Sequence, residues 1–294
     1  MEMGTEKQGG RGGGRHSQWG DVWLRFRRNR VAMVSLVLLI LIILVTVGSE
    51  VIAPYAYGKI DLPERFQFPS ALHWFGTDNL GRDILSRVLV GGKISLLVAF
   101  LSVGLAAVAG SLLGAAAGYF GGKWELLIMK CTDVLMAIPA FLLAVSVSVA
   151  LGTGVLETAL AVGLCNIPRF VRLMRAETLA VKGREFIEAA RSCGSSHGRI
   201  ILRHVFPNAL SSTIVNVTLG VSTAILQISG LSFVGLGVQP PNPEWGSMLA
   251  SGRTYIRDFW PMVVFPGIAI VVTLILFNLV GDGLRDAMDP KLKR

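Results

Sequence analysis

The histidines and cysteines are the residues of this sequence that could hold a metal ion or form disulfides, and their spacing favours neither role. They do not recur together at the short intervals of a zinc site, so no metal site is predicted. The cysteines lie far apart, and two of them fall in apolar stretches, which predicts free thiols. The residues concerned are His16, His73, His197, His204, Cys131, Cys165 and Cys193.

Nucleotide and hydrolytic chemistry are also disfavoured by the sequence. A phosphate-binding loop is approached only at Gly92-Lys93, where Ile94 follows and Arg87 stands in place of the first glycine. A membrane-embedded hydrolase would need a nucleophile and a base, or a metal cluster, and no such constellation is visible in the apolar stretches. We therefore predict a chain that is not itself an enzyme.

The most specific pattern lies in the loop from Lys182 to Asn208. Residues 184–193 suit a short helix, with Gly194 as its left-handed C-terminal cap. Ser195 can cap a second helix, which we expect to be interrupted at Pro207. Small alanines on the first helix would let a partner surface approach closely, whereas the alternative is a plain hairpin between two membrane spans. Its expected contact face consists of Phe186, Ala189, Ala190 and Cys193.

The elements that carry this loop are predicted to be membrane helices. The chain has 294 residues, of which 52% are hydrophobic and only 16% are charged, and its mean hydropathy is +0.59. A soluble domain normally carries about 25% charged residues. Because so much apolar surface would lack a polar coat in water, the composition argues against a soluble enzyme or a disordered chain and favours the bilayer as solvent.

Four uncharged runs are long enough for a helix to cross about 30 Å of hydrocarbon: residues 31–49, 94–122, 134–156 and 259–281. A fifth span is predicted at about 209–229. A sixth, weaker one covers 154–174, with Glu157, Arg169 and Arg172 near its ends. The clear spans lack ionisable residues at mid-membrane, which argues against the alternative of a stand-alone secondary transporter or channel.

The placement of positive charge predicts the topology. Most lysines and arginines fall on one side when six spans are laid out from a cytoplasmic N-terminus, so both termini are expected in the cytoplasm. The net charge of +9 is therefore interpreted as a topology signal rather than as nucleic-acid binding. Trp19, Trp23 and Phe26 recur at helical spacing among arginines, which predicts an amphipathic helix on membrane lipid or, alternatively, a merely basic flank.

Within the long loop, Glu188-Ala189-Ala190 is followed by Gly194 and then by Pro207. This arrangement resembles the EAA loop of bacterial ABC importer permeases. Residues 73–87, 231–246 and 277–290 are similar to further segments of the C-type permease subunit of dipeptide, oligopeptide and nickel importers. Together these segments span the chain from about residue 20 to its end.

The sequence departs from that family at three positions. His204 and Phe206 stand where isoleucine and leucine are usual before the proline, although such a histidine is ordinary in the peptide and nickel branch. Ile228 lies near a position at which relatives often carry an acidic residue. The resemblance therefore does not extend to a role for that carboxylate.

The resemblance implies an all-α membrane protein with six transmembrane helices, the type I ABC importer permease fold and a cytoplasmic EAA coupling loop. The expected partners are a second homologous permease subunit in a heterodimer, two cytoplasmic ATPase subunits and an extracytoplasmic solute-binding protein. ATP and Mg²⁺ would be bound by the ATPase subunits, and this chain would hold no cofactor. The residues expected to couple to the ATPase are Glu185, Phe186, Glu188, Ala189, Ala190, Gly194 and Pro207.

The function implied is import of dipeptides or oligopeptides across the bacterial inner membrane, with nickel or metal-chelate import as the alternative. The expected organisation is a cytoplasmic tail with an interfacial helix (1–30), a first span and periplasmic segment (31–93), a permease core (94–285) and a cytoplasmic C-terminal tail (286–294). The coupling loop would occupy about residues 175–207 of the core.

Two further sites are predicted. The Gly/Pro-rich segment 230–243 is unsuited to a regular membrane helix, so it is a candidate outer gate or, alternatively, a packed periplasmic turn. The gate candidates are Leu231, Ser232, Phe233, Gly235 and Gly237. Arg172 and Arg175 are expected to anchor the fourth span on the cytoplasmic side, to neighbouring loops or to lipid headgroups.

Two helix features complete the sequence prediction. An interfacial helix on the outer face is expected to begin with Asp78 as its N-cap. In the second span, small residues recur at Gly104, Gly110, Gly114 and Gly118. We expect these glycines to allow close helix packing in the first place and to line a pore in the second.

Overall fold

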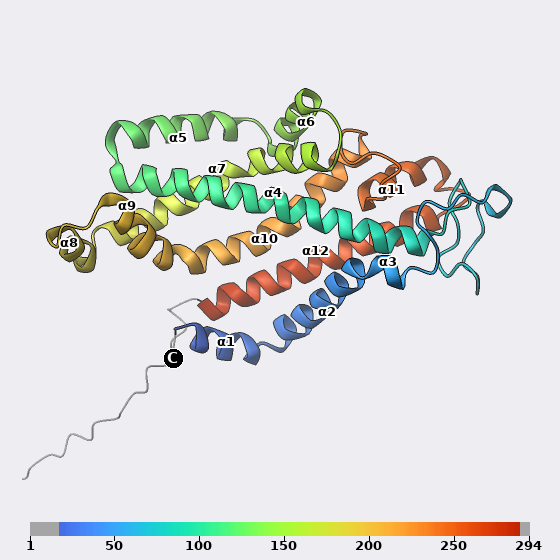
Figure 1. Ribbon diagram of the computed structural model, residues 1–294, viewed down its shortest axis with the longest axis horizontal. Helices are drawn as coiled ribbons and strands as arrows, with labels where there is room; N and C mark the ends of the chain where they lie inside the picture. Colours follow the sequence, from blue (N-terminus) through green and yellow to red (C-terminus); the bar gives the residue numbers. More distant parts are fainter. Residues whose placement is uncertain (1–17, 289–294) are drawn as a thin grey trace, which may run out of the picture.

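The computed structural model describes residues 18–288, so the expected tails 1–30 and 286–294 lie partly outside it (Figure 1). The described chain is built from helices, and one isolated bridge joins Thr77 and Asp83. The helices are α1 (Gln18–Arg28), α2 (Arg30–Val47), α3 (Ser49–Ile52), α4 (Ile84–Phe120), α5 (Gly122–Ala137), α6 (Ala140–Leu151), α7 (Val155–Lys182), α8 (Glu185–Ser192), α9 (His197–Ile200), α10 (Phe206–Phe233), α11 (Trp245–Gly252) and α12 (Pro261–Met288). Short helical turns cover Leu62–Glu64, Ile201–Val205 and Arg253–Tyr255.

Four helical stretches in the described chain are long and apolar enough to cross a membrane: α2, α4, His197–Phe233 and α12. The span expected over residues 134–156 is not one helix, because the chain breaks at Ile138-Pro139 and α5 and α6 meet at 94°. Proline disfavours helical backbone in the residue before it, and Ile138 is accordingly extended. The bent pair would make a fifth span, and α7 occupies the place of the weak sixth one.

The long helices lie roughly side by side, with α8 and α9 at one end and α3, α11 and the irregular segment before α4 at the other (Figure 1). We name these the α8 end and the α11 end. The largest buried cluster lies between the long helices and includes Val98, Phe170 and Ile225. The outward side chains of α2 are mostly apolar and exposed, as expected for a helix that faces lipid.

The most extensive helix contact joins α4 to α7, and glycines let the two helices approach closely. A Cβ atom at Gly114 would lie 2.4 Å from the backbone oxygen of Val171, and one at Gly110 would lie 2.5 Å from the Cβ of Phe170. Gly118 faces Thr178 in the same way. Close packing is therefore confirmed for these three glycines, whereas Gly104 packs on no described helix of this chain, because a Cβ atom there would meet nothing within 4 Å.

The helix expected to start after Asp78 begins later, at Ile84, and is the first part of α4. Asp83 is the N-cap, and its carboxylate accepts from the backbone N–H of Ser86 at 2.7 Å. Asp78 instead holds the preceding turn, because its carboxylate accepts from the backbone N–H groups of Leu80 and Arg82. The prediction missed this because Asp78 and Asp83 are both good N-cap residues, and the sequence alone does not decide between them.

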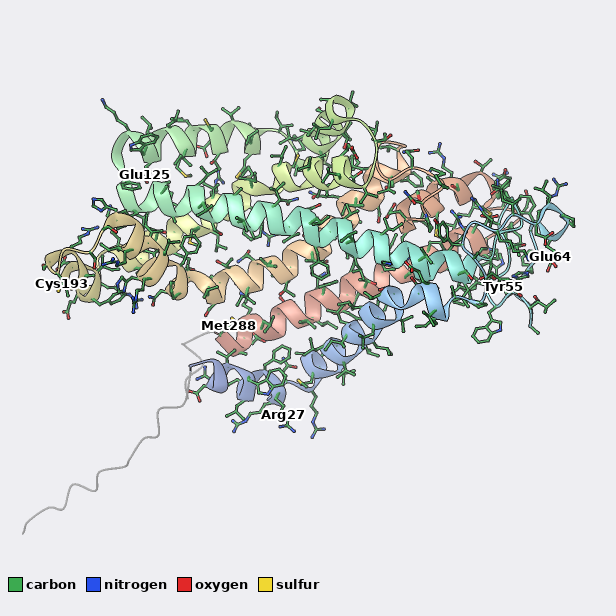
Figure 2. The ribbon with its side chains drawn as sticks, in the orientation of Figure 1. Arg27, Tyr55, Glu64, Glu125, Cys193 and Met288 are labelled. Atoms are coloured by element: carbon green, nitrogen blue, oxygen red, sulfur yellow. The ribbon has the colours of Figure 1, made fainter. Side chains whose placement is uncertain are left out.

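His73 ties the segment before α4 to the start of that helix. Its Nδ1 lies 2.9 Å from Oδ1 of Asp83, and its Nε2 lies 3.2 Å from Oε2 of Glu64. Burial lowers the pKa of His73, but the hydrogen bonds and negative charges of Asp83 and Glu64 outweigh it, so the pKa is raised above its ordinary value of 6.5. The protonated ring is thus a charged link between two carboxylates, at the end of the molecule that bears Glu64 and Tyr55 (Figure 2).

Replacing His73 with glutamine is expected to lower thermal stability in a pH-dependent way. Because the pKa is higher in the folded chain, protonated His73 stabilises it fully below pH 6.5, and this contribution is lost as pH rises through the raised pKa. The difference in apparent Tm between wild type and His73→Gln should therefore shrink from pH 6 to pH 9. His204→Gln is the control, since His204 makes no ion pair with a described carboxylate; an equal pH trend in both variants would contradict the assignment.

The predicted amphipathic helix is present as α1. Phe26 is buried, whereas Trp23, whose ring stacks on that of Phe26, is 51% exposed. Gly283 near the end of α12 lies against Phe26 and Ala32. The apolar face of α1 therefore packs partly on the protein and leaves Trp23 outside, an arrangement typical of a helix at a membrane surface.

Candidate functional site

The long loop forms a compact helical unit around α8, close to the predicted helix over residues 184–193. Its end is a Schellman motif, in which Ser195 N–H donates to the oxygen of Ala190 (3.0 Å) and Gly194 N–H to that of Arg191 (2.9 Å). Gly194 has a φ of +76°, a left-handed conformation that side chains other than glycine's disfavour. This glycine thus fixes where the helix stops and where the chain turns back.

One side of α8 is seated on its own chain. Ile187 is fully buried in a cluster with Tyr119, Val181 and Ile200, and the ring of Tyr119 comes from the last turn of α4. The hydroxyl of Tyr119 lies 2.9 Å from Nδ1 of His197, within hydrogen-bond distance. These contacts bind α8 to α4, α7 and α9. Sequence reasoning missed them, although Ile187 is a large apolar residue beside the predicted contact face.

The other side of α8 is open. Of the predicted coupling residues, Glu185, Phe186, Glu188, Ala189 and Gly194 are exposed, and so is Cys193 at the far tip of this unit (Figure 2). Ala190 differs from the prediction, because it is half-buried against the cluster of Ile187. The exposed face is thus made of small, apolar and acidic side chains, while Ala190 belongs to the buried side of the helix.

The chain leaves this unit through a continuous helix. Ser196, not Ser195, is the N-cap of α9, since its hydroxyl accepts from the N–H of Arg199. The helix is not interrupted at Pro207, because a π-helical turn over Ile201–Val205 accommodates the proline. The side-chain amide of Asn208 also donates to the backbone oxygen of His204 at 2.6 Å. Residues 197–233 therefore form one rod, and α7 leads into α8 from the other side.

Both predicted anchor arginines reach α5. Arg172 Nη2 donates to Oδ1 of Asp133 at 2.7 Å, and Arg175 Nε donates to Oε1 of Glu125 at 2.8 Å. Glu125 stands at the start of α5, close to the α8 end (Figure 2). Of the two alternatives, this geometry favours a protein anchor over lipid headgroups, because both guanidinium groups already have carboxylate partners.

The gate candidates fall in two places. Leu231, Ser232 and Phe233 continue α10, contrary to the expectation of irregular backbone, whereas Gly235 and Gly237 lie in the turn that follows. The Ser232 hydroxyl accepts from the N–H of Val238 at 3.2 Å, so it holds this turn. A shallow hollow of about 280 Å³ opens beside Ser232, Phe233 and Gly235.

A buried glutamate holds the segment after that turn. Glu244 is fully buried and forms a capping box with Ser247 at the start of α11. Its carboxylate also accepts from the hydroxyl of Ser95 on α4 at 3.0 Å, and Trp245 Nε1 donates to the oxygen of Val88 at 2.9 Å. Sequence reasoning missed this cap because Glu244-x-x-Ser247 reverses the usual order of a capping box, in which Ser or Thr comes first and Glu or Gln third after it.

Polar side chains join α7 and α10 along their length, and we name them the polar seam. Asn166 donates to Gln227 at 2.8 Å, and Arg169 Nη2 donates to Oδ1 of Asn216 at 3.2 Å. The hydroxyl of Ser212 donates to Glu177. The polar seam therefore comprises Asn166, Arg169, Glu177, Ser212, Asn216 and Gln227. The sequence search missed most of it because it looked for ionisable groups at mid-membrane.

Comparison with known proteins decides what kind of site this is. Residues 110–294 match the family described as "Binding-protein-dependent transport system inner membrane component", and residues 17–69 match the "N-terminal TM domain of oligopeptide transport permease C". The chain belongs to this permease family. It is therefore a multi-pass inner-membrane permease subunit of a peptide-type ABC importer, and the resemblance found in the sequence is confirmed.

Individual relatives support the same assignment. The chain is 48% identical over 276 residues to the glutathione transport system permease protein GsiD of Escherichia coli O6:K15:H31 (strain 536 / UPEC), covering 94% of this chain and 91% of that protein. The protein of that name from Shigella boydii serotype 4 (strain Sb227) gives the same values. A solved chain of the MetNI methionine ABC transporter in an inward-facing conformation has a TM-score of 0.57 at 19% identity, covering 70% of this chain and 98% of that one.

The structural match confirms the type I permease fold, while the count of six spans stays a prediction. Within residues 18–288, no group of three or more His, Cys, Asp or Glu side chains is placed to hold a metal ion. The importer family is one whose members act with other subunits. The permease assignment thus directs attention to surfaces and pathways rather than to a catalytic centre.

Proposed function

We propose that this permease subunit couples ATP hydrolysis in partner subunits to peptide import through the exposed face of α8. The single observation that carries the proposal is that α8 is packed on the rest of the chain along one side and exposed along the other. Its buried side is fixed by Ile187 and Tyr119, whereas Phe186 and Ala189 are left open to a partner. Because α7 precedes α8 in the chain and the continuous helix of residues 197–233 follows it, a displacement of α8 by a bound partner would move both helices.

The partners in this proposal are a second homologous permease subunit, two cytoplasmic ATPase subunits and an extracytoplasmic solute-binding protein. The ATPase subunits bind ATP and Mg²⁺, and this chain is non-catalytic and holds no cofactor. Both termini and α8 are cytoplasmic, and the α11 end is periplasmic. ATP binding needs only to favour one arrangement of the helices over the other to shift the population between inward and outward openings.

The remaining predicted sites take supporting roles in the proposal. The segment of Leu231 to Gly237 forms the outer gate, where the turn after α10 borders a hollow. Arg172 and Arg175 anchor α7 to α5, so that these helices move together. The predicted division of the chain at residues 30, 93 and 285 is retained as a proposal.

The proposed cargo is a short peptide, and glutathione is the first candidate. Two relatives at 48% identity are named as glutathione transport permeases. Nickel or a metal chelate is the alternative cargo carried by the same architecture. The cargo class can therefore be tested directly with a small panel of labelled solutes.

The test is purification of the complex from native membranes with a tag on the C-terminal end, followed by reconstitution in liposomes. We expect copurifying ATPase subunits, a second permease, and ATP-dependent uptake of labelled glutathione once the binding protein is added. Uptake of nickel instead of peptide would replace the cargo assignment. A chain that purifies alone and transports without ATP would contradict the whole proposal and favour a secondary transporter.

A further inference from the structure

A polar hollow of about 460 Å³ opens between α7, α10 and α12, beside part of the polar seam. Its polar lining comes from Arg169 on α7, Ser211, Ser212 and Asn216 on α10, and Arg285 on α12. Met288 borders it at the last turn of α12, in the half of the molecule nearer to the α8 end (Figure 2). Two arginines from different helices thus face one cavity.

Arg169 differs from the two arginines that follow it at intervals of three on α7. Arg172 and Arg175 each pair with a carboxylate on α5. Arg169 is half-buried, and its hydrogen bond goes to the neutral amide of Asn216. An arginine within a membrane helix is costly without a partner and is by default a functional residue.

The chemistry of the cavity selects an oxyanion. Guanidinium groups carry five donors in a planar fork that matches carboxylate and phosphate. Arg169 uses one of its nitrogens toward Asn216, and neither Arg169 nor Arg285 forms an ion pair with a described residue. Glu177 accepts the hydroxyl of Ser212 but is not part of the lining. Among the described residues, 18–288, the hollow therefore presents donors and positive charge without a lining carboxylate.

The position of the hollow links it to the coupling motion. Arg169 stands on α7, which leads into α8, while Arg285 stands on α12, which has no direct chain connection to that unit. Movement of α7 relative to α12 would change the separation of the two guanidinium groups. An anion held between them would therefore be bound more tightly in one arrangement than in the other.

We infer that Arg169 and Arg285 form a binding site for a carboxylate of the transported peptide on the cytoplasmic half of the pathway. This inference rests on the proposed function, because it identifies the hollow as part of the import route. The site binds a carboxylate-bearing cargo in one conformation and releases it when α7 moves away from α12. A lipid phosphate has the same oxyanion chemistry and is the competing source that the test must separate.

The test compares Arg169→Gln, Arg285→Gln and the conservative Arg169→Lys in the complete complex, in nanodiscs of zwitterionic lipid only. Arg27→Gln is the matched control, because Arg27 is an exposed arginine of α1 that points away from the body of the protein (Figure 2). Equilibrium binding of labelled glutathione is measured without nucleotide, together with ATP-dependent uptake in liposomes and ATPase stimulation by the binding protein.

We expect both glutamine variants to bind glutathione at least fivefold more weakly and to lose uptake in proportion, with Arg169→Lys partly restoring both and Arg27→Gln unchanged. Stimulated ATPase activity should persist in all variants. Unchanged binding in both glutamine variants overturns the inference. The anionic lipid that copurifies with each variant is also measured before the exchange into nanodiscs. A loss of that lipid together with normal glutathione binding likewise overturns the inference and would assign the hollow to a lipid phosphate. Absence of ATP-dependent uptake in the wild type would instead refute the proposed function.

Discussion

Gly114→Ala is expected to destabilise the permease strongly, although it adds only one methyl group. The new Cβ would lie 2.4 Å from the backbone oxygen of Val171 and 2.9 Å from the Cβ of Met174. Neither atom is the flexible end of a side chain, so α4 and α7 would have to separate. Overpacking of this kind typically costs about 1–3 kcal/mol, and occasionally more. Because each kcal/mol shifts the Tm of a large domain by roughly 2–4 °C, the apparent Tm should fall by about 2–12 °C.

The measurement is thermal unfolding of the purified subunit in detergent, with Gly104→Ala as the control. Gly104 lies on the same helix, but its added Cβ would meet nothing within 4 Å. Alanine is the better helix former, so this control should be neutral or slightly more stable. Equal stability of the two variants would show that α4 and α7 do not pack as closely as described.

This pair of glycines also shows how far sequence reasoning reaches. The spacing of small residues in the second span correctly predicted a close helix contact, yet it could not exclude Gly104, which fits the same loose pattern. Which face of a helix meets a neighbour depends on where α7 lies. That information comes from packing, not from the composition of α4.

The errors in the helix boundaries have local physical causes. Hydropathy averages over a window, so it read residues 134–156 as one span although Pro139 forces Ile138 out of helical geometry. Pro207 caused the opposite error, a predicted break that does not occur, because one π turn and the side-chain amide of Asn208 let the helix continue. A proline therefore marks a position to examine rather than a certain break.

The candidate site was predicted in part. The motif located α8 and its glycine cap, because both depend on neighbouring residues in the sequence. The motif did not predict the packing of Ile187 against Tyr119 or the polar seam, because both join residues that are far apart in the chain. Uncharged polar residues such as Asn166 and Gln227 give little signal in a search for ionisable groups.

Ala189→Lys is expected to uncouple the importer while leaving its fold intact. Ala189 is exposed on α8, and its methyl group makes no part of the buried cluster around Ile187. In the proposed complex this face enters a groove of the ATPase, where a lysine would be both too large and an unpaired charge. The affinity for the ATPase subunits should fall at least tenfold, which corresponds to about 1.4 kcal/mol.

The same substitution at Ala180 provides the control for charge and bulk, since Ala180 is exposed on α7 but lies outside α8. ATPase copurification and glutathione uptake should both collapse in Ala189→Lys and stay near wild type in Ala180→Lys, with equal apparent Tm in the two. A change confined to Tm would mean that α8 serves only to close the hairpin between two spans. Full uptake in Ala189→Lys would exclude this face of α8 as the coupling surface, because a docked helix cannot accommodate a lysine at the centre of its contact surface.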